Sequence, residues 1–166
     1  MFSCFKRILC CKGKRQKNTL NKITNKSNDL SYLNNIEYND TIPFIPHIVY
    51  VKVIKVYDGD TITVASKLPL EGSPIYRFSV RLAGIDSPEI KGSSSTEKKL
   101  AIKSRDALHK LIFGKIIELR NHSKEKYGRL LADVYFDKIH VNKWMLDKKL
   151  AVEYNGGKKI RPENWD

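Results

Sequence analysis

Alternating apolar and polar positions through the first part of residues 48–151 predict three strands. Residues 48–57 (IVYVKVIKVY) are β-branched and aromatic and end at the turn dipeptide Asp58-Gly59, so they predict a strand. A second strand resumes over 61–65. Residues 75–82 alternate strictly. Their apolar face carries Tyr76, Phe78, Val80 and Leu82, and their polar face carries Arg77, Ser79 and Arg81.

The period changes to that of a helix after residue 94. Ser94 with Glu97 three residues later forms a capping-box pattern, and apolar positions then recur at helical spacing over 95–113, with Gly114 suited to the end of the helix. The remaining elements are predicted as strands over 115–120, 130–136 and 139–141, a polar loop over 121–127, and a helix over 143–149 capped by Asn142. Apart from the short strand over 139–141, the order is β-β-β-α-β-β-α, which is typical of an α+β OB-fold, a five-stranded Greek-key barrel with packed helices.

The first 47 residues follow a different pattern. They contain eight Lys or Arg against three Asp or Glu, seven Asn, and little apolar periodicity. This composition predicts a disordered basic tail. Pro43 and Pro46 mark its end, so we expect a tail over 1–47 and a folded domain over 48–166.

Composition and charge narrow the classes of function. Hydrophobic residues make up 41% of the 166 residues, which is enough for a core and excludes wholesale disorder. No apolar run approaches the roughly 20 residues that span a bilayer. The net charge of +13 favours a polyanionic partner, with nucleic acid first and an acidic membrane second. The alternative is that this charge only keeps the protein soluble.

All three cysteines, Cys4, Cys10 and Cys11, lie in the tail. The domain therefore has no disulfide framework, and a structural zinc site is disfavoured because the nearest histidine is His47. Lys6 and Arg7 interrupt the apolar start, so no secretory signal is expected and the protein is predicted to be intracellular. Cysteines beside aromatic and basic residues could be S-acylated, with the lysines in contact with an anionic membrane, and an unmodified tail stays the alternative.

Four short polar segments hold the candidate chemistry: residues 58–61, Arg81, residues 86–89 and residues 127–129. Each is ordinary alone, since an Asp-Gly pair is usually only a turn. Together, DGDT at 58–61, RLAGIDSPE at 81–89 and YGRLLA at 127–132 resemble the staphylococcal nuclease (thermonuclease, micrococcal nuclease-like) family over roughly residues 48–155.

The resemblance implies one Ca²⁺ ion, bound by the carboxylates of Asp60 and Asp86 and by the backbone carbonyl of Ser87. Hard oxygen donors without His or Cys suit Ca²⁺ or Mg²⁺ better than zinc. The resemblance also implies that Glu89 is the general base and that Arg81 and Arg129 bind the phosphate. Tyr127 would pack near the bound nucleotide, although edge packing is an equal alternative.

The activity implied by the resemblance is hydrolysis of DNA and RNA with little sequence specificity, giving 3′-phosphate ends. A non-catalytic OB-fold module that binds nucleic acid, and a membrane-bound adaptor built on the tail, are the alternatives. A degenerate module is expected to lack at least one member of the catalytic set, and all are present here. Tyr154 has an uncertain register against the family, Trp165 is expected to close the core, and His109 and His122 are expected to be bystanders.

Overall fold

The computed structural model of this chain describes residues 30–92, 94–157, 162 and 165. The chain divides into two units, Met1–Ile42 and Pro43–Asp166. The described part of the first unit has two single 3₁₀ turns, η1 (Ser31–Leu33) and η2 (Tyr38–Asp40), and no buried residue. Disorder over residues 1–29 and S-acylation of Cys4, Cys10 and Cys11 concern residues outside the described part. They stay predictions, as does a domain boundary after residue 47.

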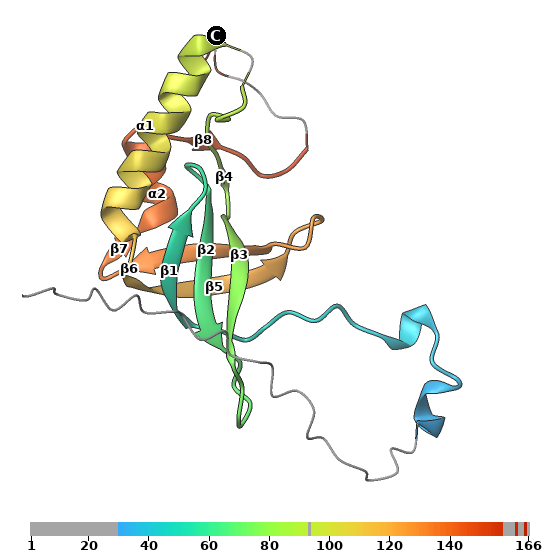
Figure 1. The fold of residues 1–166 in the computed structure, drawn as a ribbon. Helices are drawn as coiled ribbons and strands as arrows, with labels where there is room; N and C mark the ends of the chain where they lie inside the picture. Colours follow the sequence, from blue (N-terminus) through green and yellow to red (C-terminus); the bar gives the residue numbers. More distant parts are fainter. Residues whose placement is uncertain (1–29, 93, 158–161, 163–164, 166) are drawn as a thin grey trace, which may run out of the picture. The chain divides into compact units, whose positions relative to one another are not determined.

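The second unit contains a closed five-stranded mixed barrel (Figure 1). Its strands lie in the order β3-β2-β1-β5-β6, and a parallel pairing of β3 with β6 closes the barrel. The predicted α+β OB-fold is confirmed. The strands are β1 (Tyr50–Val56), β2 (Thr61–Lys67), β3 (Ile75–Leu82), β5 (Ile116–Lys124) and β6 (Leu130–Phe136).

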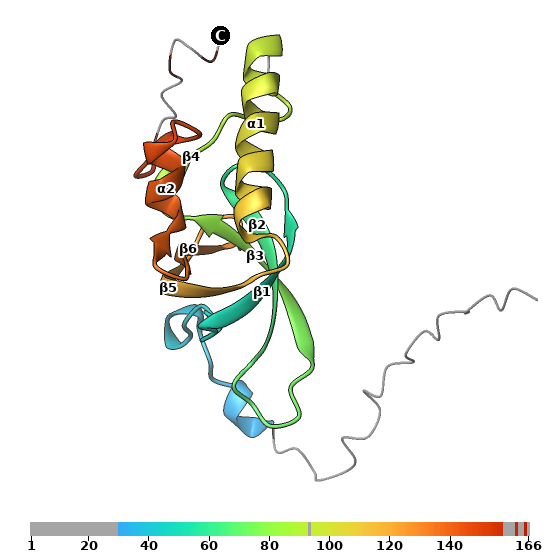
Figure 2. The ribbon, with the colours of Figure 1, turned by 90° about the vertical axis from the view of Figure 1, so that its left-hand side faces the viewer.

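Two helices, α1 (Ser95–Ile112) and α2 (Val141–Asp147), stand at one end of the barrel (Figures 1 and 2). The α1 helix directs Leu108 and Ile112 into the core that lines the barrel. Its capping pattern is confirmed, because the Ser94 hydroxyl accepts a hydrogen bond from the Glu97 N–H at 2.9 Å. Gly114, with φ of +73°, follows the last turn, as predicted for a helix end that needs a left-handed residue.

The predicted start of the second helix was wrong. The α2 helix begins at Val141, so Asn142 lies in its first turn and does not cap it. The buried Asn142 amide instead accepts from the Val134 N–H at 2.9 Å and donates to the carbonyl oxygen of Ala83 at 2.8 Å. Asn142 has a side chain suited to a helix cap, but its amide is already hydrogen-bonded to backbone groups outside α2.

The predicted polar loop over 121–127 was also too long. The β5 strand runs to Lys124 and pairs with β6 again after an irregularity between Arg120 and Ser123. Asn121 takes a left-handed conformation with φ of +53° there. A bulge keeps a strand in the sheet while it interrupts the alternation, which hid this extension from the pattern.

The β3 strand buries only half of its predicted apolar face. Val80 and Leu82 are fully buried, whereas Phe78 is half-buried and Tyr76 is exposed. The first half of β3 extends beyond the closed barrel as a two-stranded hairpin with β2 (Figure 1). Its aromatic side chains therefore lie on the surface, although their spacing is that of a core.

Three short strands complete the domain. The segments β4 (Ile85–Asp86) and β8 (Val152–Glu153) pair with each other, and β7 (Ile139–His140) pairs with β6. The β4–β8 pair was not predicted, and it places Asp86 on a strand. Trp165 is buried, in agreement with its expected role, and its carbonyl oxygen accepts from the Ser94 hydroxyl at 2.8 Å. In the described part of the chain, no helix has the length and apolar character to cross a bilayer.

Candidate active site

A buried arginine between two buried aspartates forms the centre of the site. The Arg81 guanidinium donates through Nη1 to Asp60 Oδ1 and through Nη2 to Asp86 Oδ1, each at 2.7 Å. Nη2 also donates to the Ile85 carbonyl oxygen at 3.2 Å. The structure thus brings together three of the predicted site residues. Arg81 lies 21 positions after Asp60 and 5 positions before Asp86 in the chain.

Local backbone contacts hold Asp60 in this position. Its carbonyl oxygen accepts from the Leu82 N–H at 2.8 Å, which joins the β1–β2 turn to the end of β3. Its carboxylate accepts from the Thr61 hydroxyl through Oδ1 and from the Ser87 N–H through Oδ2, each at 2.9 Å. Ser87 is buried, so the segment that follows β4 is placed directly beside the Asp60 carboxylate.

The side chain of Arg129 lies at the start of β6, next to this cluster. Its Nε donates to Glu125 Oε2 at 3.1 Å and its Nη1 donates to the Thr61 hydroxyl at 3.3 Å. Among the described residues, no acceptor binds its Nη2. The hydrogen bond from Arg129 lowers the pKa of Glu125, so this carboxylate stays charged and holds the guanidinium.

Glu89 is exposed, and the segment that carries it is anchored to the first turn of α1. The Glu89 N–H donates to Glu97 Oε1 at 3.3 Å, and Glu97 is almost fully buried. Gly92 packs against the same carboxylate so closely that a Cβ there would overlap it. Glu97 therefore fixes the backbone of the Glu89 segment as well as the start of the helix.

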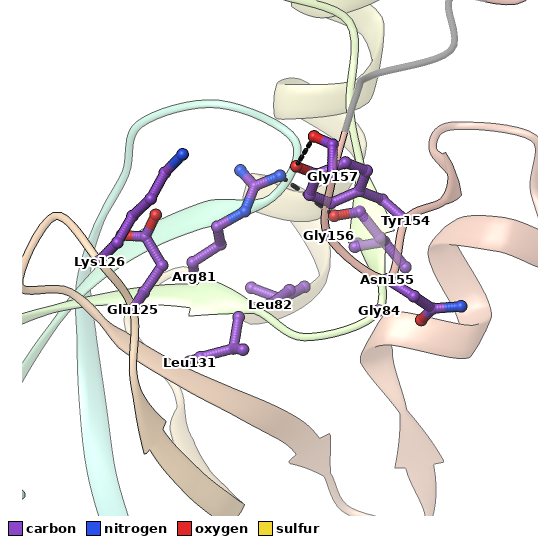
Figure 3. Close-up of a pocket in the computed structure, with 11 residues that line it drawn as sticks. Arg81, Leu82, Gly84, Glu125, Lys126, Leu131, Tyr154, Asn155, Gly156 and Gly157 are labelled. Carbon is purple, nitrogen blue, oxygen red and sulfur yellow. Dashed lines mark hydrogen bonds between the residues drawn. The ribbon is translucent and has the colours of Figure 1, made fainter.

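Two cavities meet around these groups. The first, which we call the central cleft, has a volume of about 410 Å³. Its lining includes Asp58, Arg81, Glu89, Tyr127, Arg129 and Tyr154. A neighbouring cavity of about 460 Å³ shares Arg81 and Tyr154 with it (Figure 3). The cleft thus collects two arginines, one exposed glutamate and three tyrosines, the third being Tyr57.

Two of the three tyrosines, Tyr127 and Tyr154, are held differently. Tyr127 is 73% exposed, and the Lys126 ammonium lies 4.8 Å from its ring centre. Tyr154 is half-buried, its ring centre lies 5.9 Å from the Arg81 guanidinium carbon, and its hydroxyl donates to the Gly157 carbonyl oxygen at 3.0 Å (Figure 3). The structure therefore places Tyr154 in the site, although its register along the family pattern was uncertain.

Ionisation in the cluster follows from burial and from the neighbouring charges. Burial opposes the charge of Arg81, but the charge of Asp60 and the hydrogen bond to Asp86 outweigh it, so the pKa of Arg81 is raised. Burial, and after it the charge of Asp60, raise the pKa of Asp58 from 3.8 to about 7. Three carboxylates thus surround one buried guanidinium, and the cluster has an excess of negative charge.

The raised pKa of Asp58 has a testable consequence for stability. Between pH 4 and pH 7 the folded chain binds a proton at Asp58 that the unfolded chain has lost, so its free energy of unfolding falls as pH rises through this range. Asp58→Asn removes that dependence. In chelator at pH 8 the variant is expected to be more stable than wild type by about 1–2 kcal/mol. Urea unfolding at pH 4 and pH 8 measures the difference, and an equal effect at both pH values would contradict it.

The donor chemistry of the cluster fits a hard divalent cation. Among the described residues, no group of three or more His, Cys, Asp or Glu side chains is placed to hold a metal ion. A cation here would draw on the carboxylates of Asp60 and Asp86 together with neutral oxygens. Both carboxylates converge on one guanidinium and all candidate donors are oxygens, which is the set that Ca²⁺ or Mg²⁺ prefers.

Two carboxylates at the site were not predicted from the sequence as part of it. Glu125 holds Arg129, and Glu97, read only as part of a capping box, supports the backbone of Glu89. For Glu125 the signal was its place four residues before Arg129; a buried glutamate in the first helical turn has no signal of its own. His109 and His122, the two expected bystanders, line neither the central cleft nor the neighbouring cavity. His109 stacks on Phe113, with ring centres 4.2 Å apart.

Comparison with known proteins shows the family to which the chain belongs. The sequence model of the family described as staphylococcal nuclease homologue matches residues 79–164, just over half of the chain. An uncharacterized endonuclease of Haemophilus influenzae is 34% identical over 62% of this chain and 51% of its own length. The staphylococcal-like nuclease CAN1 of Arabidopsis thaliana is 36% identical over 47% of this chain and 22% of its own.

A third relative is the probable endonuclease C19F8.04c of Schizosaccharomyces pombe. It is 34% identical over 48% of this chain and 37% of its own length. The chain therefore spans about half the length of the Haemophilus relative and less of the other two.

Proposed function

Because the chain belongs to the staphylococcal nuclease family, we propose that it is a nuclease that hydrolyses phosphodiester bonds of nucleic acids. The proposal extends to Ca²⁺ dependence, to action on DNA and RNA with little sequence specificity, and to products with 3′-phosphate ends. The observation that carries it is the central cleft, where Arg81, Arg129 and Glu89 line one cavity beside two converging aspartates.

In this proposal Arg81 and Arg129 bind the phosphate of the substrate. Arg81 commits three of its five N–H donors to Asp60, Asp86 and the Ile85 carbonyl, which leaves two for a phosphate in the cleft. Arg129 is steadied by Glu125 and Thr61 through Nε and Nη1, and its Nη2 is the group that would meet the phosphate. Guanidinium donors held in this way need little reorganisation as negative charge grows on the phosphorus oxygens.

Glu89 is the proposed group that orients or deprotonates the attacking water. Its side chain is exposed and lines the cleft, while its backbone is held by the buried Glu97. A carboxylate on a fixed backbone can direct a water at phosphorus from a constant position. The proton removed from water would pass to this carboxylate, and the departing 5′-oxygen would take a proton from solvent.

The carboxylates of Asp60 and Asp86 are the groups that would hold Ca²⁺. Bound there, the ion would neutralise charge on the phosphate. The Ser87 N–H and the Thr61 hydroxyl orient the Asp60 carboxylate. The Ser87 carbonyl remains a proposed third ligand.

A cleavage assay tests this function. The purified chain is mixed with fluorescently labelled single-stranded DNA or RNA in Ca²⁺, and in parallel with a chelator. We expect cleavage of both nucleic acids in Ca²⁺ and at least a hundredfold slower cleavage in chelator. Products should shift in gel mobility after treatment with a 3′-phosphatase. Binding of either strand without cleavage in Ca²⁺ would overturn the enzyme proposal in favour of a non-catalytic OB-fold module.

A further inference from the structure

A third cavity, of about 350 Å³, lies outside the central cleft, between β3, the adjoining ends of β5 and β6, and the chain that leads into β1. Its lining includes Phe44, Arg77, Phe78, Lys124, Gly128 and Leu130, and we call it the Phe44 groove. None of these residues belongs to the predicted catalytic set, and the proposed function makes no use of the groove.

The charge of the groove is uncompensated. Arg77 and Lys124 are both exposed, and no ion pair among the described residues involves either of them. No Asp or Glu among the described residues lines the groove. Two cations beside one cavity, without a carboxylate, match a ligand with more than one negative charge.

Aromatic rings lie beside the two cations. Phe44 is 71% exposed, so its ring is accessible to a ligand in the groove. Phe78 is half-buried and contacts the Tyr76 ring, with centres 6.3 Å apart and planes at 59°. Flat aromatic faces interleaved with cations are the pattern that binds single-stranded nucleic acid, because bases stack while phosphates meet the charges.

The groove and the central cleft are lined by alternating residues of one hairpin. In the β5–β6 hairpin, Lys124, Gly128 and Leu130 line the groove, while Tyr127 and Arg129 line the cleft. The hairpin is thus a wall shared by the two cavities.

The β3 strand also contributes residues to both cavities. Arg77 lies at the groove and Arg81 at the cleft, on the same face of the strand and about 13 Å apart along it. A chain of phosphates that leaves the cleft along β3 would therefore meet Arg77 next.

We propose that the Phe44 groove binds the part of a single-stranded substrate that lies a few nucleotides from the bond being cut. Phosphates contact Arg77 and Lys124, and a base stacks on Phe44. This inference rests on the proposed function, because it assigns a path to the strand that the cleft cuts. It predicts that long strands bind better than short ones, and that the difference arises in this groove.

The test measures binding and cleavage separately. Fluorescence anisotropy of a labelled oligothymidylate of about 12 nucleotides is recorded in chelator, so that the strand is not cut while its binding is measured. The double variant Arg77→Gln/Lys124→Gln is expected to bind about tenfold more weakly than wild type. Its plot of log affinity against log salt should be shallower by about 1.4, because two phosphate contacts are lost. Phe44→Ala is expected to weaken binding at least fivefold with an unchanged salt slope.

A matched control removes the same charge elsewhere. Lys103→Gln/Lys110→Gln changes two exposed lysines on α1 that line none of the three cavities. We expect less than a twofold loss for this control. Equal losses in the two double variants would overturn the inference, since they would reflect net charge alone. Unchanged binding in the groove variants would overturn it as well, and would leave the groove to a protein partner or to the N-terminal tail.

Cleavage in Ca²⁺ distinguishes this inference from the proposed function. With wild type active, the groove variants should lose about tenfold in kcat/KM on the long strand and retain wild-type kcat/KM on a dinucleotide. If the groove variants have the wild-type kcat/KM on both the long strand and the dinucleotide, the inference about the groove is overturned and the nuclease proposal stays intact. If wild type cuts neither substrate, the nuclease proposal fails, and the anisotropy comparison still decides whether the groove binds the strand.

Discussion

Replacing Glu89 by Gln is expected to slow phosphodiester cleavage by about 10²- to 10⁴-fold, with little change in stability. The amide has nearly the shape of the carboxylate but cannot accept the proton of the attacking water. Because Glu89 is exposed and its anchor is a backbone N–H, the variant should keep the fold and the contact with Glu97. Single-turnover cleavage of a short DNA strand in Ca²⁺ measures the effect.

The matched control for this prediction is Glu71→Gln. Glu71 is exposed between β2 and β3 and lines none of the three cavities. The cleavage rate of Glu71→Gln should therefore stay within twofold of wild type. Thermal unfolding should show the same midpoint for both variants within a few degrees. A Glu89→Gln enzyme that cuts as fast as the control would remove Glu89 from the mechanism, whatever the fate of the rest of the site.

Replacing Arg81 by Met is expected to lower the free energy of unfolding by about 3–5 kcal/mol in chelator. The change leaves Asp60 and Asp86 buried without the guanidinium that both of them contact, and their side chains are 3% and 6% exposed. Arg81→Lys should lose less, because one ammonium can hold one of the two carboxylates but lacks the fork that holds both. Urea unfolding at pH 7 measures all three proteins.

A compensating variant separates charge from packing in this cluster. Arg81→Met combined with Asp60→Asn and Asp86→Asn has no uncompensated charge at these positions, so it should be more stable than Arg81→Met alone by at least about 1 kcal/mol. Ca²⁺ should also stabilise Arg81→Met and should not stabilise the triple variant. A loss below about 1 kcal/mol for Arg81→Met would mean that the guanidinium contributes no net stability to the two carboxylates.

The elements that follow from local rules were predictable from sequence. The barrel strands have alternating or β-branched patterns, and α1 has both a Ser94 cap and a terminal Gly114 in the positions expected. These signals depend on neighbours within four residues, so they are visible in the chain itself. The errors occur where distant contacts compete with the local pattern, as at Asn142, whose amide bonds to the barrel instead of capping α2.

The candidate site divides in the same way. The residue types, their order and the family to which they point could be recognised in the chain, because short motifs preserve the chemistry that a phosphodiester requires. The partners of those residues could not be recognised. That Arg81 joins two aspartates, that Glu125 holds Arg129 and that a buried Glu97 fixes the Glu89 backbone depend on how the strands and α1 meet.

Charge shows the division most clearly. The chain alone specifies +13, the composition from which a basic tail and a folded domain are predicted, and the motifs of the staphylococcal nuclease family. Only the tertiary fold places Arg77 and Lys124 in one groove with the exposed Phe44 and the half-buried Phe78, and Arg81 between buried carboxylates at the central cleft. The reason is physical: a side chain's charge is a property of the residue, whereas its pKa, its partners and its access to a ligand depend on burial and on groups that only the tertiary fold brings within a few ångströms.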